Sequence, residues 1–334
     1  MERKIRVIQY GLGPIGNKVT QYLAERPAFQ IVGAIDIDPA KVGRDVGELA
    51  GLSQPLGVKV SADAKAVLAQ VQADVVVLTT TSSLEKARPQ ILEILSYGLP
   101  IVSTCEELSY PWDTSPQLSR EIDRAAKEHG VAVLGTGVNP GFLMDLLPIV
   151  LTGICQQVKA VTVERIQNAQ FRRIPFQRKI GAGLTVEQFQ QKVKEGTLRH
   201  VGLTESMEMI ASRMGWKLDR SEDIIEPVIA TQRVAAGELA IEPGMALGVS
   251  QMGHGYMQGK EVVTLIFRAT IGEPEPRDRV RIEGVPVVES VVPGGINGDV
   301  ATCAITVNAI PVVMRARPGL RTMADIEPIT FFEG

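Results

Sequence analysis

Several kinds of residue are scarce in this chain of 334 residues, and each scarcity excludes a class of function. The three cysteines, Cys105, Cys155 and Cys303, lack metal-ligand spacing, so we expect no metal site and no disulfide framework. Their reduced state suits the cytoplasm. The net charge of −3 provides no broad basic surface, so nucleic acid is not an expected partner.

Long hydrophobic runs are missing as well. No apolar stretch reaches the length of a membrane span, and the opening MERKIRVIQYG leads directly into a strand pattern without signal-peptide features. We therefore expect a cytoplasmic protein that makes no membrane contact. Hydrophobic residues at 45% and aromatic residues at only 4% predict a sizeable core that is mainly aliphatic.

Strand and helix patterns alternate through the first half of the chain. The β-branched runs predict strands at residues 4–9, 29–35, 74–78, 100–103 and 131–134. Helical spacing between them predicts helices at residues 14–26, 64–71, 84–97 and 115–129. Strands this continuously apolar are typical of a parallel sheet covered on both faces. The fold class is therefore α/β, with an N-terminal Rossmann domain of the doubly wound type over residues 1–148.

A glycine-rich turn follows the first strand and opens the first helix, which is the context that a dinucleotide-binding turn requires. Its residues are Gly11, Leu12, Gly13, Pro14, Ile15 and Gly16. Asp36 ends the second strand about 20 residues later, where an acid accepts hydrogen bonds from the adenosine ribose. A carboxylate there repels a 2′-phosphate and favours NAD, whereas nearby Lys41 and Arg44 leave NADP use open.

A run of hydroxyl residues follows the strand at 74–78. Thr79, Thr80 and Thr81 are predicted to bind the nicotinamide side of the cofactor, because ligands of open α/β sheets sit at the carboxyl ends of strands. Ser82 or Ser83 is expected to cap the next helix.

Two adjacent acids, Glu106 and Glu107, follow the strand at 100–103 on the same sheet edge. A carboxylate beside the nicotinamide can hold a substrate ammonium and remove its proton, because only a free amine can give up hydride. We assign this role to Glu106, with Glu107 as the alternative. Cys105 raises a rival interpretation, a thiol nucleophile. Such a thiol needs a nearby base, and the sequence offers only three histidines for that role, so a buried, inert cysteine is the favoured interpretation. Asn139, in the glycine-rich segment 135–141, offers an amide to the cofactor.

The second half changes to alternating patterns, which predict an α+β domain with a mostly antiparallel sheet over residues 149–296. A cationic loop at 172–183 is interpreted either as a solvated surface or as an anion-binding segment. Helices are expected at 185–195 and 203–214, and strands at 261–271, 279–282 and 285–292. An apolar helix at 299–307 is expected to return to the first domain, which residues 297–334 would complete.

The motifs together resemble the amine dehydrogenases related to 2,4-diaminopentanoate dehydrogenase and 3,5-diaminohexanoate dehydrogenase, within the dihydrodipicolinate reductase-like superfamily. The resemblance rests on GLGPIG with AIDIDPAKVG, STCEELSYPW, GTGVNPGF, and RRIPFQRKIGAG with RHVGLTES. It implies that a glutamate of STCEE, Glu106, holds and deprotonates the amine, and that the chain forms a homodimer through its C-terminal sheet. It also implies a substrate pocket, for which the candidates are Tyr110, Phe142, Arg165, Gln167, Phe176 and His200.

The predicted function is therefore reversible oxidative deamination of a primary amine by NAD, with ketone and ammonia as the other reactants. Two alternatives stay open. A dihydrodipicolinate reductase would reduce a cyclic imine, but its His-His pair, following lysine and Ser-Gly-Thr turn are not found in the sequence. A dinucleotide sensor without enzymatic activity would leave the carboxylate at the sheet edge unexplained.

Overall fold

The structure is a computed structural model, and it describes residues 3–170, 172, 174–237 and 239–334. The chain forms two compact units, one made of Met1–Phe142 with Asn297–Gly334 and the other of Leu143–Ile296. The assignment of a cofactor domain and a substrate domain to particular boundaries stays a prediction.

In its described part, the first unit is built on a parallel sheet with strand order β15-β6-β5-β4-β1-β2-β3. The strands are β1 (Ile5–Tyr10), β2 (Phe29–Ile35), β3 (Val60–Ser61), β4 (Val75–Leu78), β5 (Ile101–Ser103), β6 (Ala132–Gly135) and β15 (Gly319–Arg321). Their pairings are all parallel, so every strand ends at the same edge of the sheet.

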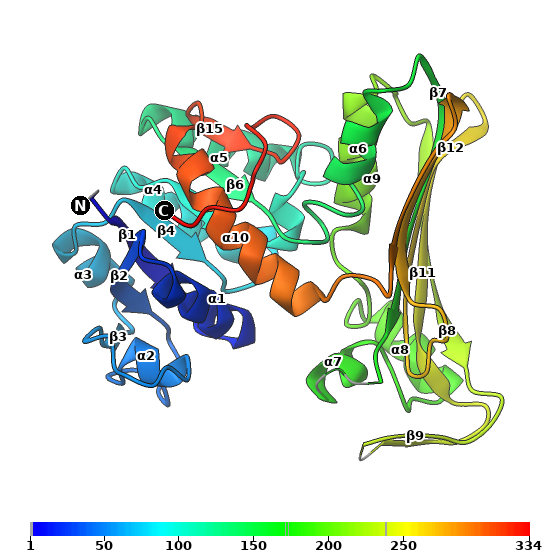
Figure 1. The fold of residues 1–334 in the computed structure, drawn as a ribbon, viewed down its shortest axis with the longest axis horizontal. Helices are drawn as coiled ribbons and strands as arrows, with labels where there is room; N and C mark the ends of the chain where they lie inside the picture. The colour runs from blue at the N-terminus through cyan, green and yellow to red at the C-terminus, as the bar shows by residue number, and fades with distance from the viewer. Residues whose placement is uncertain (1–2, 171, 173, 238) are drawn as a thin grey trace. The chain divides into compact units, whose positions relative to one another are not determined.

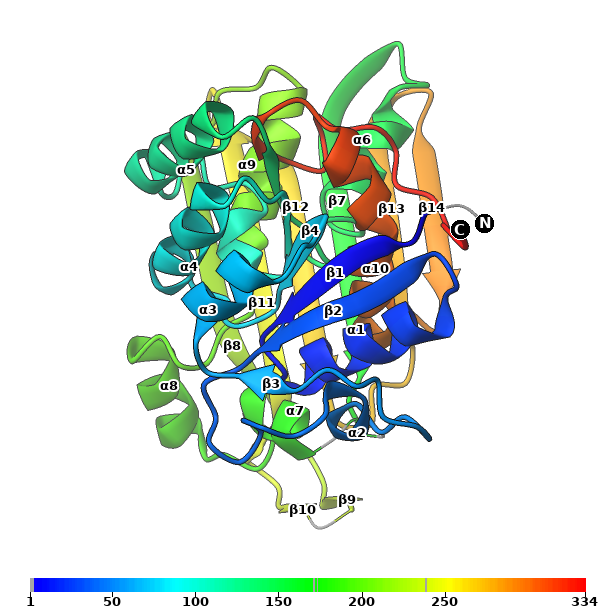
Figure 2. The same cartoon turned by 90° about the vertical axis from the view of Figure 1, so that its left-hand side faces the viewer.

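Helices cover both faces of this sheet (Figure 2). The helices are α1 (Pro14–Glu25), α2 (Val46–Leu49), α3 (Ala64–Gln70), α4 (Leu84–Ser96), α5 (Pro116–Glu128) and α10 (Gly298–Arg315). Helices α1 and α10 pack side by side on one face, and α3, α4 and α5 cover the other. The core between β4, β5 and α4 is aliphatic, with Val76, Ile91 and Ile101 fully buried.

Helix α10 is longer than the predicted helix at 299–307. It runs from Gly298 to Arg315 and contains Pro311. The buried residues lie on more than one face, so a single apolar stripe does not mark its full length.

The second unit contains a mixed sheet with strand order β14-β13-β7-β12-β11-β8 among the described residues. These strands are β7 (Gln157–Asn168), β8 (Arg220–Ile229), β11 (Ala246–Met257), β12 (Lys260–Thr270), β13 (Arg277–Val285) and β14 (Val288–Pro293). Only the β7–β12 pairing is parallel, which confirms the prediction of a mostly antiparallel sheet. A separate hairpin is formed by β9 (Val234–Ala236) and β10 (Leu239–Ile241).

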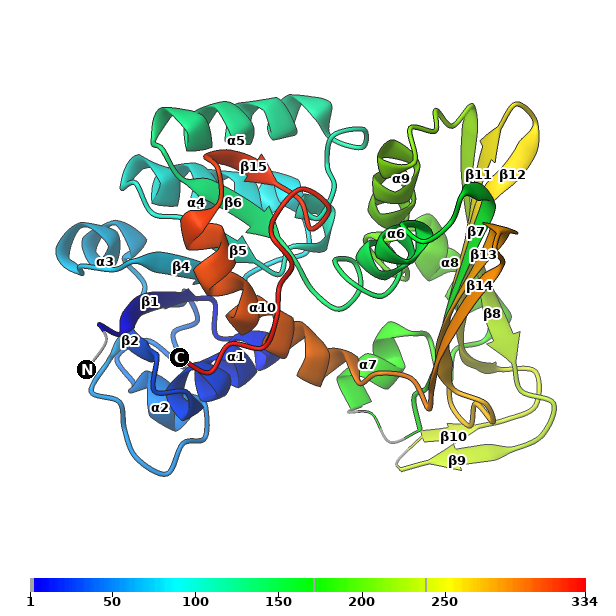
Figure 3. The same ribbon diagram turned by 45° about the horizontal axis from the view of Figure 1, so that its top comes forward.

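The helices of this unit gather on one face of its sheet, as Figures 1 and 3 show. They are α6 (Leu146–Thr152), α7 (Ile174–Lys179), α8 (Val186–Lys194) and α9 (Leu203–Arg213). Two expectations are wrong in detail. The loop expected at 172–183 contains α7, and the single strand expected at 285–292 is divided between β13 and β14. Pro286, which lacks an amide hydrogen, lies between β13 and β14 and interrupts the strand expected at 285–292.

Candidate active site

Loops of the first unit meet at the carboxyl edge of its sheet. Thr79, after β4, donates its backbone N–H to the carbonyl of Tyr10, at the end of β1, at 2.8 Å. Thr136, after β6, donates in the same way to the carbonyl of Ser103, at the end of β5, at 2.8 Å. The parallel pairing therefore brings together the glycine turn, the hydroxyl run, the glutamate pair and segment 135–141.

The glycine turn is tightly packed at two positions and open at the third. Gly11 has φ +94°, and a Cβ there would lie 2.8 Å from the backbone of Thr79. A Cβ on Gly16 would lie 2.0 Å from the carbonyl oxygen of Gly11. Gly13, the N-cap residue of α1, has nothing within 4 Å of the position of its Cβ. This open space at a helix N-terminus fits the pyrophosphate of a dinucleotide, as the sequence predicts.

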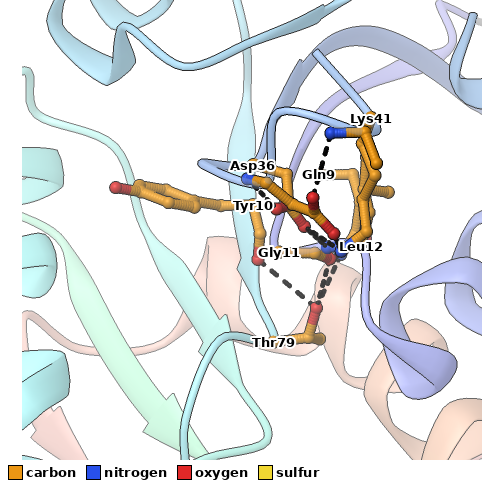
Figure 4. A network of polar contacts seen from close by, with 9 residues as sticks. Gln9, Tyr10, Gly11, Leu12, Asp36, Lys41 and Thr79 are labelled. Carbon is orange, nitrogen blue, oxygen red and sulfur yellow. Dashed lines mark hydrogen bonds and ion pairs between the residues drawn. The ribbon is translucent and has the colours of Figure 1, made fainter. Parts of the chain in front are cut away.

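Asp36 is held at the end of β2 by three hydrogen-bond donors, of which Leu12 and Lys41 are labelled in Figure 4. Its Oδ2 accepts from the backbone N of Leu12 at 2.7 Å and from Lys41 Nζ at 3.1 Å, and its Oδ1 accepts from the backbone N of Asp38 at 2.9 Å. Burial opposes ionisation, but the hydrogen bonds and the Lys41 charge outweigh it and lower the pKa of Asp36. The carboxylate is therefore ionised at neutral pH and is paired with a cation.

Gln9 is a buried residue that the sequence analysis did not identify. Its Nε2 donates to the carbonyl of Gly11 at 2.9 Å and to Thr79 Oγ1 at 2.8 Å, and Thr79 Oγ1 donates to the same carbonyl at 2.7 Å (Figure 4). The two side chains fix the shape of the glycine turn. A glutamine inside an otherwise apolar strand was the available signal.

Thr80 and Thr81 form side-chain hydrogen bonds with residues of the same loop and of helix α4, which follows it. Thr80 Oγ1 donates to Gln90 Oε1 at 2.6 Å, and Thr81 Oγ1 accepts from the backbone N of Ser83 at 3.2 Å. The expected capping by Ser82 or Ser83 is wrong. Ser83 is the N-cap residue of α4, but its side chain makes no cap hydrogen bond within the described structure.

The two glutamates lie in η1 (Glu106–Leu108), a 3-10 turn directly after β5. Oε2 of Glu107 accepts a hydrogen bond at 2.8 Å from the backbone N of Leu84, the first residue of α4. The half-buried side chain of Glu106 makes no hydrogen bond or ion pair with any described residue. The two carboxylates, which are adjacent in the sequence, therefore have different surroundings in the structure.

Cys105 is buried beside this turn, with its Sγ donating to the carbonyl of Ser82 at 3.2 Å. Burial and the nearby Glu106 carboxylate raise the pKa of the thiol well above its ordinary value of 9.0. A thiol held protonated is a poor nucleophile, which argues against the rival interpretation.

Segment 135–141 packs against η1 and upon itself. A Cβ on Gly135 would lie 2.6 Å from the backbone of Leu108, and one on Gly141 would lie 2.6 Å from that of Gly137. Asn139 is half-buried within this segment. Of the two aromatic candidates in this unit, Tyr110 is buried and Phe142 is half-buried.

In the second unit, two candidate pocket residues belong to the helix-covered side of the sheet. Arg165 of β7 forms an ion pair of 2.7 Å with Asp278 of β13, and the two side chains are only 3% and 5% exposed. Burial lowers the pKa of Arg165 and the Asp278 carboxylate opposes this shift. Gln167, two residues further along β7, can turn its amide oxygen toward Arg165 and accept from Nε at 3.3 Å. Arg165 therefore already has a buried counterion.

His200 lies over the neighbouring strand. Its ring stacks on Phe267 with centroids 4.2 Å apart, and its backbone N donates to Gln251 Oε1 at 2.6 Å. Burial, with the positive charges of Lys179 and Arg165, lowers the pKa of His200 to about 3. The imidazole is therefore neutral at physiological pH, so it can donate or accept a hydrogen bond but does not act as an acid–base group in that range.

Phe176 lies in α7, where the guanidinium of Arg172 stands 4.3 Å from the centroid of its ring. This cation–π contact engages Arg172, one of the basic residues of the cationic segment at 172–183. Arg173, which belongs to the same segment, lies outside the described residues.

Comparison with known proteins identifies the relatives of this chain. The profile of the 2,4-diaminopentanoate dehydrogenase C-terminal domain matches residues 142–332, and that of the dihydrodipicolinate reductase N-terminus matches residues 5–105. The 2,4-diaminopentanoate dehydrogenase of Acetoanaerobium sticklandii is 36% identical over 97% of this chain and 93% of its own length. The chain belongs to the 2,4-diaminopentanoate dehydrogenase family.

Two further relatives of this family member are named amine dehydrogenases. The protein from Streptomyces virginiae is 25% identical over 96% of each chain. The solved structure of the enzyme from Mycobacterium smegmatis is 27% identical, covers 99% of this chain and 98% of its own, and superimposes with a TM-score of 0.87. These findings confirm the predicted family, the predicted fold class and the predicted class of enzyme, an NAD(P)-dependent oxidoreductase of the amine dehydrogenase type.

No helix among the described residues is both long enough and apolar enough to span a membrane. Among the same residues, no three histidine, cysteine or acidic side chains are grouped so that they could hold a metal ion. The roles of the individual site residues stay predictions.

Proposed function

We propose that this enzyme oxidises a primary amine reversibly to a ketone and ammonia, with Glu106 as the proton-transferring group. Family membership supports the reaction class. The assignment of Glu106 is supported by a contrast between the two acids. Glu107 accepts a hydrogen bond from Leu84, whereas Glu106 has no polar partner among the described residues. A general base needs lone pairs that are available to the substrate.

The residues present fit a nicotinamide dinucleotide, which when bound supplies or accepts the hydride. The open position beside Gly13 would receive the pyrophosphate, Asp36 the adenosine ribose, and Thr79–81 with Asn139 the nicotinamide side. We assign a preference for NAD from Asp36. Because Lys41 partly neutralises that carboxylate, we propose that NADP is accepted with lower affinity.

Glu106 would act at two points. It removes the proton from the substrate ammonium, so that the amine lone pair can assist the departure of hydride. After this proton has passed to solvent, the carboxylate stabilises the positive charge on the substrate iminium, accepts a proton from the water that attacks it and passes that proton to the departing nitrogen. In reductive amination the same carboxylate returns these protons. Tyr110 and Phe142 are proposed to exclude bulk water.

The substrate proposed is an amine that also carries a carboxylate. The relative from Acetoanaerobium sticklandii is named for 2,4-diaminopentanoate, a substrate of that kind. The surroundings of His200 support the proposal, since burial and, after it, the positive charges of Lys179 and Arg165 lower its pKa to about 3. A neutral imidazole beside cations is suited to donate to an anionic group without adding a charge of its own.

The test measures NADH or NADPH consumption by the purified enzyme with excess ammonium and a panel of ketones, and NAD reduction with amines. We expect turnover with 2,4-diaminopentanoate to exceed that with 2,4-diaminopentane, which has a methyl group in place of the carboxylate. Glu106→Gln should abolish turnover and leave NADH affinity unchanged within about threefold, because it removes the base and keeps the shape. Full activity of that variant would refute the assignment.

A cyclic imine reductase is the second candidate, and the match of residues 5–105 to the dihydrodipicolinate reductase N-terminus favours it. The same assay separates the two, because reduction of a cyclic imine needs no ammonium. Binding of NADH without turnover of any amine or imine would instead support a dinucleotide sensor.

We further propose a cytoplasmic homodimer formed through the face of the second unit's sheet opposite its helices (Figure 3). Cross-strand neighbours Ile224, Met252 and Ile266 provide an apolar row on strands β8, β11 and β12. Light scattering should give twice the chain mass for the wild type and the chain mass for Ile266→Lys. A monomeric wild type would contradict the proposal.

A further inference from the structure

Glu107 supplies a cap to a helix from a different part of the chain. Helix α4 begins at Leu84, and its N-cap residue, Ser83, makes no side-chain cap hydrogen bond with any described group. The backbone N of Leu84 instead donates to Oε2 of Glu107 at 2.8 Å. A carboxylate at this place satisfies one of the orphan N–H groups of the helix and interacts favourably with its dipole.

Two more hydrogen bonds join the same turn to the same loop. The backbone N of Glu107 donates to the carbonyl of Ser82 at 3.3 Å, and Cys105 Sγ donates to that carbonyl at 3.2 Å. Residues 79–83 are the hydroxyl run that is predicted to hold the nicotinamide side of the cofactor. The turn with the glutamates is therefore bonded directly to the cofactor loop.

The opposite side of the turn is fixed by packing. A Cβ on Gly135 would approach the backbone of Leu108 to 2.6 Å, so β6 and η1 lie in close contact. Ser109, which is buried, donates its Oγ to the carbonyl of Glu106 at 2.7 Å. The backbone of Glu106 is thus held from both sides, while its carboxylate has no described polar partner.

We propose that Glu107 is a positioning residue for Glu106. Its carboxylate fastens η1 to the loop at 79–83, so that the Glu106 carboxylate keeps a fixed place relative to the cofactor loop. This inference rests on the proposed role of Glu106. It assigns the two adjacent acids different functions: Glu106 exchanges protons, and Glu107 maintains the geometry in which that exchange is productive.

The test compares Glu107→Ala, Glu107→Gln and the double variant Ser83→Asp/Glu107→Ala, with the exposed Glu128→Ala as the matched control. Glu107→Ala should lower kcat about 10- to 100-fold, as expected for misplacement by about 1 Å. Its NADH affinity should stay within about threefold, and the pH dependence of its kcat should keep the shape of the wild-type profile. Glutamine keeps an oxygen that can accept from Leu84, so Glu107→Gln should retain kcat within about fivefold.

Ser83→Asp separates positioning from stability. Aspartate is a strong N-cap residue, so the double variant should recover the wild-type melting temperature, which Glu107→Ala lowers. Its kcat should stay as low as that of Glu107→Ala. Recovery of kcat together with stability would overturn the proposal, since it would show that only helix capping matters. A Glu107→Gln variant as inactive as Glu106→Gln would overturn it as well.

Amide hydrogen exchange makes the test independent of turnover. In Glu107→Ala, residues 79–84 and 103–109 should both exchange faster than in Glu128→Ala. Unchanged exchange in either segment overturns the proposal. If the wild type turns over no amine but the exchange result holds, the proposed function fails while the positioning contact stands.

Discussion

Replacing Lys41 with alanine is expected to change the cofactor preference of the enzyme. Lys41 Nζ lies 3.1 Å from Asp36 Oδ2 and 3.4 Å from Asp38 Oδ2, and its side chain is 25% exposed. It is therefore the cation that offsets the negative charge at the end of β2. Without it, the Asp36 carboxylate has no cation beside it at the place where we propose that the adenosine ribose binds.

The magnitude follows from the charges involved. The 2′-phosphate of NADP carries a charge of about −1.5 to −2, whereas the ribose hydroxyl of NAD is neutral. A unit charge pair about 4 Å apart is worth about 4 kcal/mol at an effective dielectric constant of 20 and about 1 kcal/mol in water. For a lysine that is partly exposed and screened by salt, we expect about 1–2 kcal/mol. NADPH affinity should therefore fall about 5- to 30-fold in Lys41→Ala, while NADH affinity changes by less than about threefold.

The assay measures the KM of each cofactor in the ammonium-dependent reaction and the Kd of each by nicotinamide fluorescence. Lys65→Ala, which removes an exposed lysine from α3, serves as the control. Asp36→Ala should raise the preference for NADPH, because it frees Lys41 for the phosphate. An equal loss of NADH and NADPH affinity in Lys41→Ala would refute the reasoning and show that the lysine only stabilises its loop.

Three other perturbations test the energetics of the units. Asp278→Ala should destabilise the enzyme by about 3–5 kcal/mol in urea unfolding, because Arg165 is left buried without its counterion, and Asp278→Leu with Arg165→Met should recover most of the loss. His200→Asn should keep the limbs of the kcat/KM pH profile between about pH 5 and 8, since the imidazole is already neutral there, and a missing limb would contradict this. Although burial opposes it, the partners of Asp36 and Asp74 lower both pKa values below the ordinary 3.8. Their contribution to stability is complete above that pH and lost below it. His200 acts at higher pH, because burial lowers its pKa from the ordinary 6.5 to about 3, so the unfolded chain takes up a proton that the folded enzyme does not. The melting temperature should therefore begin to fall below about pH 6.5 and fall more steeply below about pH 4.

The first unit was largely predictable because its sheet is buried on both faces. The apolar run at 29–35 coincides with β2, and the glycine turn follows β1 as expected. In the second unit the predictions did not include β8 or β11. Strand β11 contains three glycines and several polar residues, so no clean alternation marks it. Its place is decided by pairing with β8 and β12, which is tertiary information.

The candidate site shows the same division. Asp36 was identified because its place depends on a local turn and one strand. The partners of Arg165 were not, because Gln251, Phe267, Arg165 and Asp278 form a row across four strands whose register only the folded sheet sets. The different surroundings of Glu106 and Glu107 were equally hidden, since they depend on the N-terminus of a helix that precedes them by more than 20 residues.

The contrast between Asp36 and Glu106 supports the two different roles that we propose for acids at one sheet edge. Both acids follow a parallel strand of the same sheet. Asp36 accepts hydrogen bonds on both oxygens, which keeps it ionised and fixed and suits it to the recognition of a ribose. Such saturation would be a disadvantage for a base, because every donor that stabilises the carboxylate lowers its affinity for a proton. A base therefore has to be positioned through its backbone and not through its carboxylate. The hydrogen bonds of Glu107 with Leu84 and Ser82 and the contact of Leu108 with Gly135 hold the backbone in this way, and they leave the Glu106 carboxylate available for the role that we propose for it.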